Sequence, residues 1–451
     1  MSIEVQLILA ILTGIAFLLV LIIRFQLNAF LSLLLASIWI GLLGGISPAD
    51  IGGVISKGMG DTLGFVATIV GLGSIFGAIL EHTGGAHQLS SFLIKKTGEN
   101  KARIAMLFSG FIVAIPVFFD VAFIILFPVA HAVSHRTKKP LLWYALPLLT
   151  GIAITHSFIP PTPGPVAVAD ILQVDLGWMI GLGLVVGLPV AVIVGLGFSK
   201  FLSFPTAIDQ ETEEITAKPS NDNVNLVSLT NWAITLPLLL MVMQAVLKTL
   251  VESNTLPIFT GYEFILFIGH PFAALIIATL FALYFLGRKA GLNQKQLTEI
   301  SAKALGPAGT IILITGAGGV LKQMLITTGI GQMIADQISG SPASLVILAY
   351  GVAALVRILQ GSATISMITA AGIIGPVLST LDDISMPERT LLALAIAAGS
   401  VIASHVNDSG FWLVNRFLKH DVKESLRSVT ILSTLNSLTS FIIIYLISLM
   451  L

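Results

Sequence analysis

Ionisable side chains inside long apolar stretches are the residues of this chain that could do chemistry. Five of them stand out at widely separated positions: Asp120, His156, Arg357, His405 and Asp408. A charged group is expensive to hold in hydrocarbon, so such residues usually mark a functional site. A carboxyl group there can carry a proton, and an arginine can bind a carboxylate through two parallel hydrogen bonds. Proton transfer and anion binding are therefore the chemistry that these residues predict.

Asp120 lies in the segment IPVFFDV, after Pro116 and among Phe118, Phe119 and Val121. Burial in such surroundings disfavours the ionised carboxylate and favours its protonated form, which is what a proton carrier needs. The other interpretation is structural, with the aspartate capping the helix that follows. The two roles are compatible.

A second polar segment, RILQGSATIS, contains Arg357, Gln360, Gly361, Ser362 and Thr364. Gly361 permits a tight turn, and the helix start that follows offers free backbone N–H groups to an anion. We expect this segment to contact the substrate. Arg357 is either a ligand of a substrate carboxylate or a structural arginine paired with Asp120 or Asp408.

Two further segments are expected to be broken helices. Residues 155–170, THSFIPPTPGPVAVAD, hold four prolines that cannot continue a helix, so the backbone must unwind beside His156 and Thr162. Residues 404–412, SHVNDSGFW, place His405, Asn407 and Asp408 in a polar run inside an apolar block. Irregular backbone at membrane depth must be buried in protein or line a polar cavity. Proline clusters are usually surface turns and histidines are often structural, but we expect both segments to line a cavity.

Other kinds of site are not supported. The histidines and aspartates lack the spacing of a metal motif, no phosphate-binding G-x-x-x-x-G-K-[ST] occurs, and no G-x-S-x-G occurs. The chain has no cysteine and a net charge of zero, so thiol chemistry and nucleic-acid binding are not expected. No cofactor is predicted. Lys322 and Glu81 lie nearer the ends of apolar blocks, where such side chains usually extend toward the membrane surface.

The elements that carry these residues are predicted to be membrane-spanning helices. Of 451 residues, 55% are hydrophobic and 10% charged, against roughly 25% charged in a soluble domain. Apolar blocks long enough to cross the bilayer recur at about 5–23, 28–45, 65–81, 104–130, 141–158, 177–199, 231–251, 262–286, 306–326, 344–377, 391–415 and 428–450. The fold class is thus an all-α polytopic membrane protein.

The chain also resembles itself. VGLGSIFGAILEHTGG (70–85) matches TGAGGVLKQMLITTGI (315–330), and residues 115–124 and 153–158 match 355–364 and 402–407 in the same order. We therefore divide the chain into an N-terminal repeat, 1–204, a polar linker, 205–230, and a C-terminal repeat, 231–451.

Loop charge gives the orientation, because Lys and Arg concentrate in cytoplasmic loops. The basic loops place the linker in the cytoplasm and both termini outside. Residues 104–134 begin and end at basic loops, and residues 344–377 begin and end at loops without lysine, so each is predicted to be a re-entrant hairpin. Each half then has about five crossings, one hairpin and one broken helix, and the second half enters inverted. Such inverted repeats are typical of secondary transporters.

These segments resemble the gluconate:proton symporter family of the ion-transporter group. The likeness covers essentially the whole chain and is carried by GFIVAIPVFFDVAFIILFP, THSFIPPTPGPVAVAD, GAGGV, QGSAT and SHVNDSGFW. Thr162 stands where many relatives have a histidine, and the Phe119–Asp120 pair is Tyr-Glu in some relatives. The resemblance implies uptake of gluconate, another sugar acid, a small hydroxy acid or D-serine. It also implies a bacterial inner-membrane homodimer that works by an elevator motion.

The residues and the resemblance together favour proton-coupled import of a small carboxylate. Asp120 or Asp408 would carry the proton, and Ser362 with its neighbours would hold the carboxylate. Asn407, Thr162 and His156 would hold hydroxyl groups, with His405 nearby. A sodium-coupled carrier is the alternative, since carbonyl, Asn and Ser oxygens suit a hard cation. An intramembrane enzyme is the more distant alternative.

Overall fold

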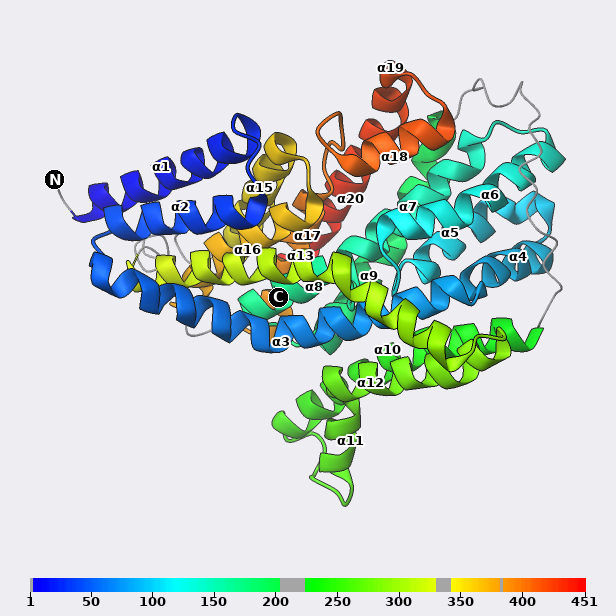
Figure 1. Ribbon diagram of the computed structural model, residues 1–451, viewed down its shortest axis with the longest axis horizontal. Helices are drawn as coiled ribbons and strands as arrows, with labels where there is room; N and C mark the ends of the chain where they lie inside the picture. Colours follow the sequence, from blue (N-terminus) through cyan, green and yellow to red (C-terminus); the bar gives the residue numbers. More distant parts are fainter. Residues whose placement is uncertain (1–2, 203–223, 330–341, 382–383) are drawn as a thin grey trace.

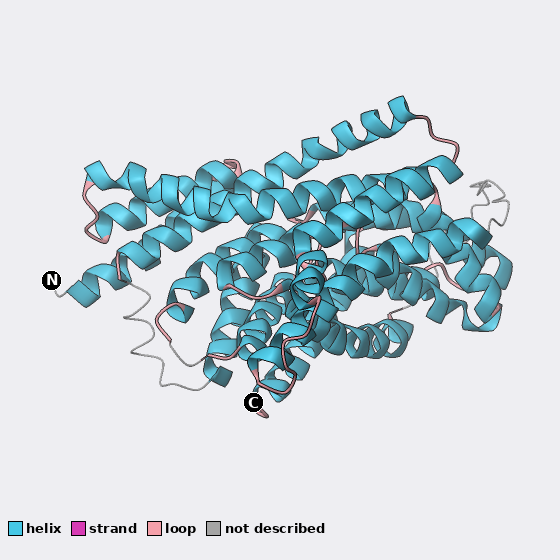
Figure 2. Cartoon of the chain, turned by 90° about the horizontal axis from the view of Figure 1, so that it is seen from below, coloured by secondary structure: helices cyan, strands magenta, loops and turns pink. Residues whose placement is uncertain are grey.

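The computed structural model describes residues 3–202, 224–329, 342–381 and 384–451, and throughout them the chain is helical with no strand (Figures 1 and 2). The helices of the first half are α1 (Ile3–Ile23), α2 (Ala29–Leu43), α3 (Pro48–His82), α4 (Gly85–Thr97), α5 (Ala102–Val113), α6 (Phe119–Thr137), α7 (Leu142–Phe158), α8 (Pro163–Leu172) and α9 (Leu176–Val192). Those of the second half are α10 (Val224–Glu252), α11 (Tyr262–Gly269), α12 (Pro271–Phe281), α13 (Gln294–Thr327), α15 (Pro342–Gln360), α16 (Ala363–Leu378), α17 (Met386–Ser400), α18 (Ser409–Leu418), α19 (Val422–Ser425) and α20 (Ile431–Ser448).

The number of membrane spans differs from the ten crossings expected. Within the described residues, eight helices are long and apolar enough to cross a membrane, or nine if α11 and α12, bent by 66°, count as one span. Helix α2 falls short because its 15 residues extend only about 22 Å, and the predicted block 391–415 is divided between α17 and α18. Helix α6, which we assigned to a hairpin, is long enough by itself.

The predicted linker is shorter than expected where the structure describes it. Helix α10 begins at Val224, so residues 224–230 of the predicted linker 205–230 are helical. Thr230 is fully buried in that helix, where it packs against Gly85 of α4. Residues 205–223 lie outside the described part of the chain.

Two long helices, α3 and α13, form the most extensive helix pair of the molecule (Figure 1). Gly58 contacts Gly319, whereas Gly71, further along α3, approaches Leu305, near the start of α13. The two helices therefore run antiparallel. They occupy corresponding places in the two halves, so their opposite directions agree with an inverted repeat. Inversion of the two complete halves stays a prediction.

The expected breaks are present in both halves. Helices α5 and α6 are separated at residues 114–118, and α15 and α16 at Gly361 and Ser362. The chain unwinds at 159–162 between α7 and α8, and at 401–408 between α17 and α18. The second break begins three residues earlier than the predicted segment 404–412, and its helix resumes at Ser409.

The two halves pack reciprocally at these breaks. Helix α16 of the second half packs on α8 of the first, with Met367 beside Gly164. Helix α6 of the first half packs on α18 of the second, where Phe417 meets the rings of Phe123 and Phe127 edge to face. Each predicted hairpin thus lies against the broken helix of the other half, which brings all four breaks together.

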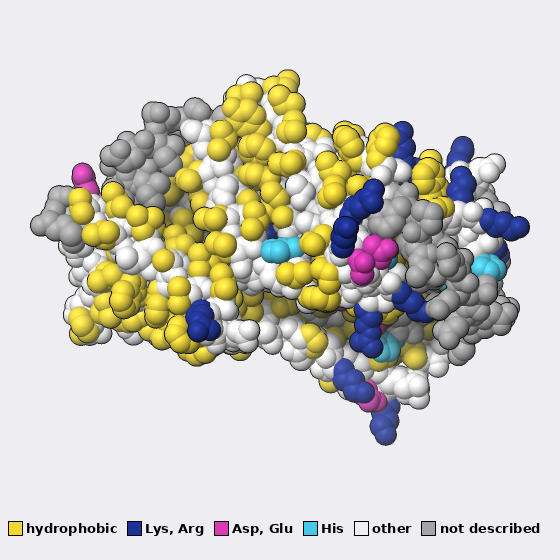
Figure 3. All heavy atoms as spheres, turned by 90° about the horizontal axis from the view of Figure 1, so that it is seen from above, with side chains coloured by type: hydrophobic (Ala, Val, Ile, Leu, Met, Phe, Trp, Pro, Cys, Tyr) yellow, Lys and Arg dark blue, Asp and Glu magenta, His cyan; other side chains and the backbone are white. Residues whose placement is uncertain are grey.

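Basic side chains mark one end of the molecule. Figure 3 shows most of the visible Lys and Arg side chains gathered at one end of that face, with hydrophobic side chains over much of the remainder. A separation of this kind is what the positive-inside rule produces. Assignment of the basic end to the cytoplasm stays a prediction.

The contact at Gly58 gives a test of the α3–α13 pair. A Cβ atom at Gly58 would lie 2.7 Å from the carbonyl oxygen of Gly319 and 2.8 Å from Cα of Val320, so the helices would have to separate. We expect Gly58→Ala to lower the free energy of unfolding by about 1–3 kcal/mol, as overpacking does. Thermal unfolding in detergent would measure it. The control is Gly53→Ala on the same helix, where a Cβ meets nothing within 4 Å; equal effects of both would contradict the proposed crossing.

Candidate functional site

A cavity of about 440 Å³ lies where the breaks converge. This volume is within the usual range for sites that enclose a small organic ligand. Its wall includes aliphatic residues such as Leu149, Ile311 and Leu432. Its polar lining comes from α6, α7, α20 and the breaks of the second half: Asp120, His156, Ser157, Arg357, Ser362, Thr364, Ser404, Asp408, Ser409, Ser433 and Asn436.

Three helices begin at this cavity. Phe119 starts α6, Ala363 starts α16 and Ser409 starts α18, and all three residues line the cavity. The first N–H groups of a helix have no partner within the helix and carry the positive end of its dipole. Convergence of three such ends makes the cavity attractive to an anion. The sequence anticipated this feature for α16 alone.

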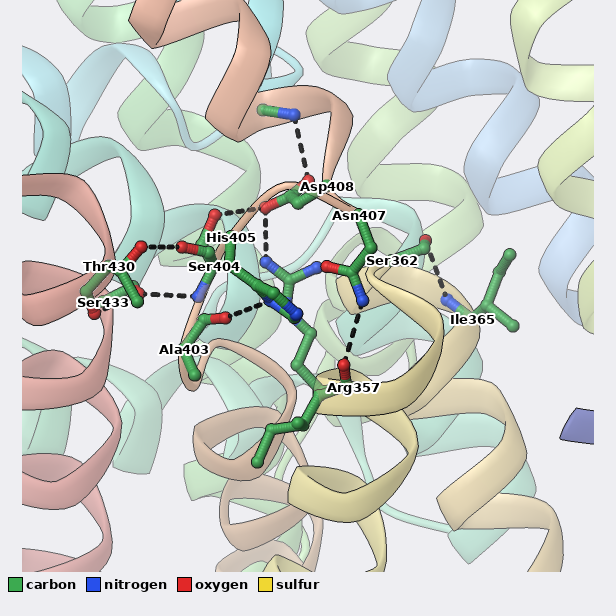
Figure 4. A network of polar contacts seen from close by, with 12 residues as sticks. Arg357, Ser362, Ile365, Ala403, Ser404, His405, Asn407, Asp408, Thr430 and Ser433 are labelled. Carbon is green, nitrogen blue, oxygen red and sulfur yellow. Dashed lines mark hydrogen bonds and ion pairs between the residues drawn. The ribbon is translucent and has the colours of Figure 1, made fainter. Parts of the chain in front are cut away.

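Arg357 and Asp408 form an ion pair at the centre of the polar network (Figure 4). Nη2 of Arg357 lies 2.5 Å from Oδ2 of Asp408. Asp408 also accepts hydrogen bonds from the hydroxyl of Ser404 and, at 2.9 Å, from the backbone N–H of Gly410, so that it caps α18. The structural pairing that we considered for Arg357 is thus present, and its partner is Asp408 rather than Asp120.

The remaining donors of Arg357 have no partner within the described residues. Its side chain is only 5% exposed, yet Nε and Nη1 make no hydrogen bond. Leaving buried charged donors unsatisfied is costly. Asn436 lines the same cavity and has an unpaired acceptor where Arg357 has unpaired donors. Its Oδ1 is buried and has no hydrogen-bond partner among the described residues. The cavity therefore offers an unused cationic donor and an unused neutral acceptor.

Asp120 is placed differently from the expectation. It lies in the first turn of α6 but makes no capping hydrogen bond, so the capping role is absent. Its side chain is exposed to the cavity instead of being packed among the phenylalanines. Asp120 and Asp408 both line the cavity. Two acidic groups thus face one cationic group.

His156 lies beside Asp120 in the wall of the cavity. Its ring is 6.5 Å from the ring centres of both Phe118 and Phe119, and its Nδ1 has no hydrogen-bond partner among the described residues. Ser362 and Thr364 also line the cavity; the hydroxyl of Ser362 caps α16 by accepting from Ile365 N at 3.4 Å.

Several predicted ligands instead hold the breaks together. The Thr162 hydroxyl donates to the carbonyls of His156 and Ile159, at 2.9 and 2.8 Å, and is 3% exposed. Asn407 Nδ2 donates to the Ile358 carbonyl at 2.9 Å, and so completes the end of α15. Neither side chain lines the cavity, and their role as substrate ligands stays a prediction.

Three more predicted residues lie just outside the cavity lining. His405 Nδ1 is 2.9 Å from the Ala403 carbonyl, within the break. Gln360 has a buried Oε1 without a partner but does not reach the lining. Gly361 has φ +90°, and a Cβ there would collide with the backbone of Asn407. Gly361 therefore matters because it lets the two breaks of the second half touch.

The sequence did not predict that α20 lines the cavity or that the amine of Lys322 is held inside the protein. Ser433 and Asn436 of α20 line the cavity, and Ser433 Oγ accepts from Ser404 N at 2.9 Å. They were missed because isolated polar residues in an apolar helix are common. Lys322 does not extend to the surface as expected; its amine donates to the Ile171 carbonyl at 2.6 Å, near Asp170.

Comparison with known proteins identifies the family. The sequence model of the GntP family permeases matches residues 6–450. The chain belongs to the GntP permease family. It is 36% identical to the low-affinity gluconate transporter of Escherichia coli over 93% of both chains, and 36% identical to a gluconate permease of Pseudomonas aeruginosa over 100% of this chain and 99% of that one. It is 34% identical to the Gnt-II system L-idonate transporter of Escherichia coli over 94% of this chain and 95% of the relative.

Solved structures agree with the architecture. The YdaH transporter of Alcanivorax borkumensis has a TM-score of 0.62 at 16% identity, covering 89% of both chains. MtrF of Neisseria gonorrhoeae has a TM-score of 0.55 at 16% identity, covering 88% of this chain and 84% of that one. This GntP permease is accordingly a multi-pass membrane transporter of the gluconate group and not an enzyme.

Gly361 provides a test of the site's geometry. Gly361→Ala places a side chain in a left-handed conformation and against Asn407, so the breaks must separate. We expect at least a tenfold loss of gluconate uptake, measured in proteoliposomes at equal protein content. The control, Gly351→Ala in α15, meets nothing within 4 Å and should retain uptake. Normal uptake by the Gly361 variant would remove the contact from the mechanism.

Proposed function

We propose that this permease imports gluconate or a closely related hydroxy acid across the bacterial inner membrane by proton symport. The observation that carries the proposal is the buried Arg357, whose Nε and Nη1 are unpartnered beside a cavity where three helices begin. These groups suit a carboxylate. The unpartnered Oδ1 of Asn436 and the hydroxyls of Ser433 and Thr364 suit the hydroxyl groups of a sugar acid. The names of the relatives, which carry gluconate or L-idonate, support the same class of substrate.

Proton coupling follows from the charges that face the cavity. With Asp120 and Asp408 ionised, one positive and two negative side chains line it, a net charge of −1 that opposes an anion. Protonation of Asp120 neutralises the lining and lets the anion bind at Arg357. Asp408 is held by Arg357, Ser404 and Gly410, so Asp120 is the carboxyl that is free to accept the proton. Proton and anion then bind together.

The membrane potential makes this coupling useful. Moving one negative charge inward against an inside-negative potential costs about 2.3 kcal/mol per 100 mV, and one accompanying proton cancels that cost. The transport unit would move as an elevator, with the linker in the cytoplasm and both termini outside, in a homodimer. The antiparallel α3 and α13 and the reciprocal packing at the breaks support such a motion.

The first test is uptake of labelled gluconate into proteoliposomes under an imposed pH gradient without sodium. We expect accumulation that collapses when a proton ionophore is added. Unlabelled L-idonate, D-serine and glycerate as competitors would define the substrate. Accumulation that requires sodium and survives the ionophore would replace proton coupling with sodium coupling.

Arg357→Lys tests the carboxylate ligand. Lysine keeps the charge but lacks the planar set of donors that binds a carboxylate in two places. We expect KM for gluconate to rise by about tenfold or more, since about 1.4 kcal/mol corresponds to a factor of ten. Arg416→Lys, at the exposed end of α18, is the control and should leave KM unchanged. An unchanged KM in the Arg357 variant would exclude it as the carboxylate ligand.

Asp120→Asn tests the proton carrier. The amide cannot carry the proton, yet it leaves the lining neutral, so gluconate should still bind. We expect downhill entry and gluconate exchange to persist while accumulation driven by a pH gradient is lost. Asp408→Asn should instead impair binding, because it removes the partner of Arg357. Normal accumulation by the Asp120 variant would contradict the assignment.

A further inference from the structure

A second cavity, of about 210 Å³, adjoins the first. Phe118, Val121 and Pro307 line both cavities and so form the wall between them. Phe118 and Val121 flank Asp120 in sequence, which places the proposed proton carrier next to this wall. The second cavity lies between the end of α3, the start of α13 and the break at 114–118.

Glu81 is one of three ionisable residues in the lining of this second cavity, with His82 and Lys303, and the transport mechanism has used none of them. It lies in the last turn of α3 and is partly buried, and its carboxylate makes no hydrogen bond or ion pair within the described residues. It interacts electrostatically with the adjacent His82, whose Nδ1 is 2.8 Å from the Ala78 carbonyl.

The other charged group of the second cavity is already paired. Lys303 of α13 lies 2.8 Å from Glu299, one turn earlier on the same helix. The break at 114–118 and the start of α6 contribute only apolar residues to the lining, Pro116, Val117, Phe118 and Val121, and α4 contributes none. Within this lining Glu81 is thus an acceptor that no cation occupies.

We propose that Glu81 takes the proton from Asp120 and releases it on the side of the second cavity. This inference rests on the proposed proton symport and adds its exit step. The O–H bond of protonated Asp120 breaks and an O–H bond forms on Glu81, by way of water in the adjoining cavities. Glu81 then loses the same proton to bulk water, so no charge or electron is left over.

Transfer of the proton also releases the substrate. Once Asp120 is ionised again, the side chains around Arg357 carry a net negative charge and repel the bound anion. Helix α13 begins within the basic segment 288–303, and its residues Ile300 and Lys303 line the second cavity, so the proton leaves on the predicted cytoplasmic side. Glu81 is therefore a positioning residue for the proton and need not touch gluconate.

The test compares Glu81→Gln with the control Glu263→Gln, whose side chain is exposed on α11 outside the lining of both cavities. Two rates are measured in proteoliposomes: exchange of labelled for unlabelled gluconate at equal pH, and net uptake under a pH gradient. Exchange needs no loss of the proton, whereas net uptake does. We expect Glu81→Gln to keep exchange within about twofold and to lose net uptake at least tenfold. Glu263→Gln should keep both.

Each other outcome overturns the inference. Unchanged net uptake in Glu81→Gln would show that the proton leaves by another route, and equal loss of exchange would show a role in binding. If Glu81→Gln does not fold, Glu81→Asp takes its place. Its side chain keeps the carboxyl group but is shorter by one methylene, so it must slow net uptake more than exchange. The wild-type protein decides the proposed function separately: without proton-driven accumulation, symport itself fails before any variant is compared.

Discussion

The ion pair of Arg357 and Asp408 is the interaction on which the site depends. A guanidinium group that is 5% exposed inside an apolar helical protein must be compensated. The carboxylate of Asp408 balances the charge of the guanidinium by pairing with its Nη2. The same carboxylate also caps α18. The pair therefore joins the end of α15 to the break at 401–408. Removal of either partner would leave a buried charge alone, so the geometry of both segments is fixed together.

The four breaks follow from a more general constraint. Backbone groups inside a membrane must be satisfied by protein or by a polar cavity. Thr162 satisfies the carbonyls at the end of α7, and Asn407 satisfies a carbonyl at the end of α15. The hydroxyl proton of Thr162 and one amide N–H of Asn407 are thus used by the backbone. The first residues of α6, α16 and α18 line the cavity, and among the described residues side chains cap only one N–H group of α16 and one of α18.

The sequence predicted where the helices break, because prolines, Gly361 and a run of polar residues cannot be placed in lipid-facing helix. It did not predict the full lengths of α3 and α13, since Lys57, Asp61 and Lys303 interrupt their apolar pattern. It also did not predict the backbone contacts of Thr162 and Asn407. Thr162 and Asn407 have the same chemistry as a substrate ligand, and only the three-dimensional contacts show that backbone carbonyls occupy their donors.

In the proposed mechanism, coupling and selectivity use different parts of the same cavity. The proposed proton coupling depends on the charges of Arg357, Asp120 and Asp408, and any monovalent carboxylate of suitable size would satisfy it. Selectivity must come from the neutral polar groups, Ser433 and Asn436 of α20, which can distinguish the pattern of hydroxyl groups. An unpaired acceptor rejects a ligand that lacks the matching donor far more strongly than an apolar wall rejects a misfit. Substitutions in α20 can therefore change which hydroxy acid a member of this family carries without changing the coupling.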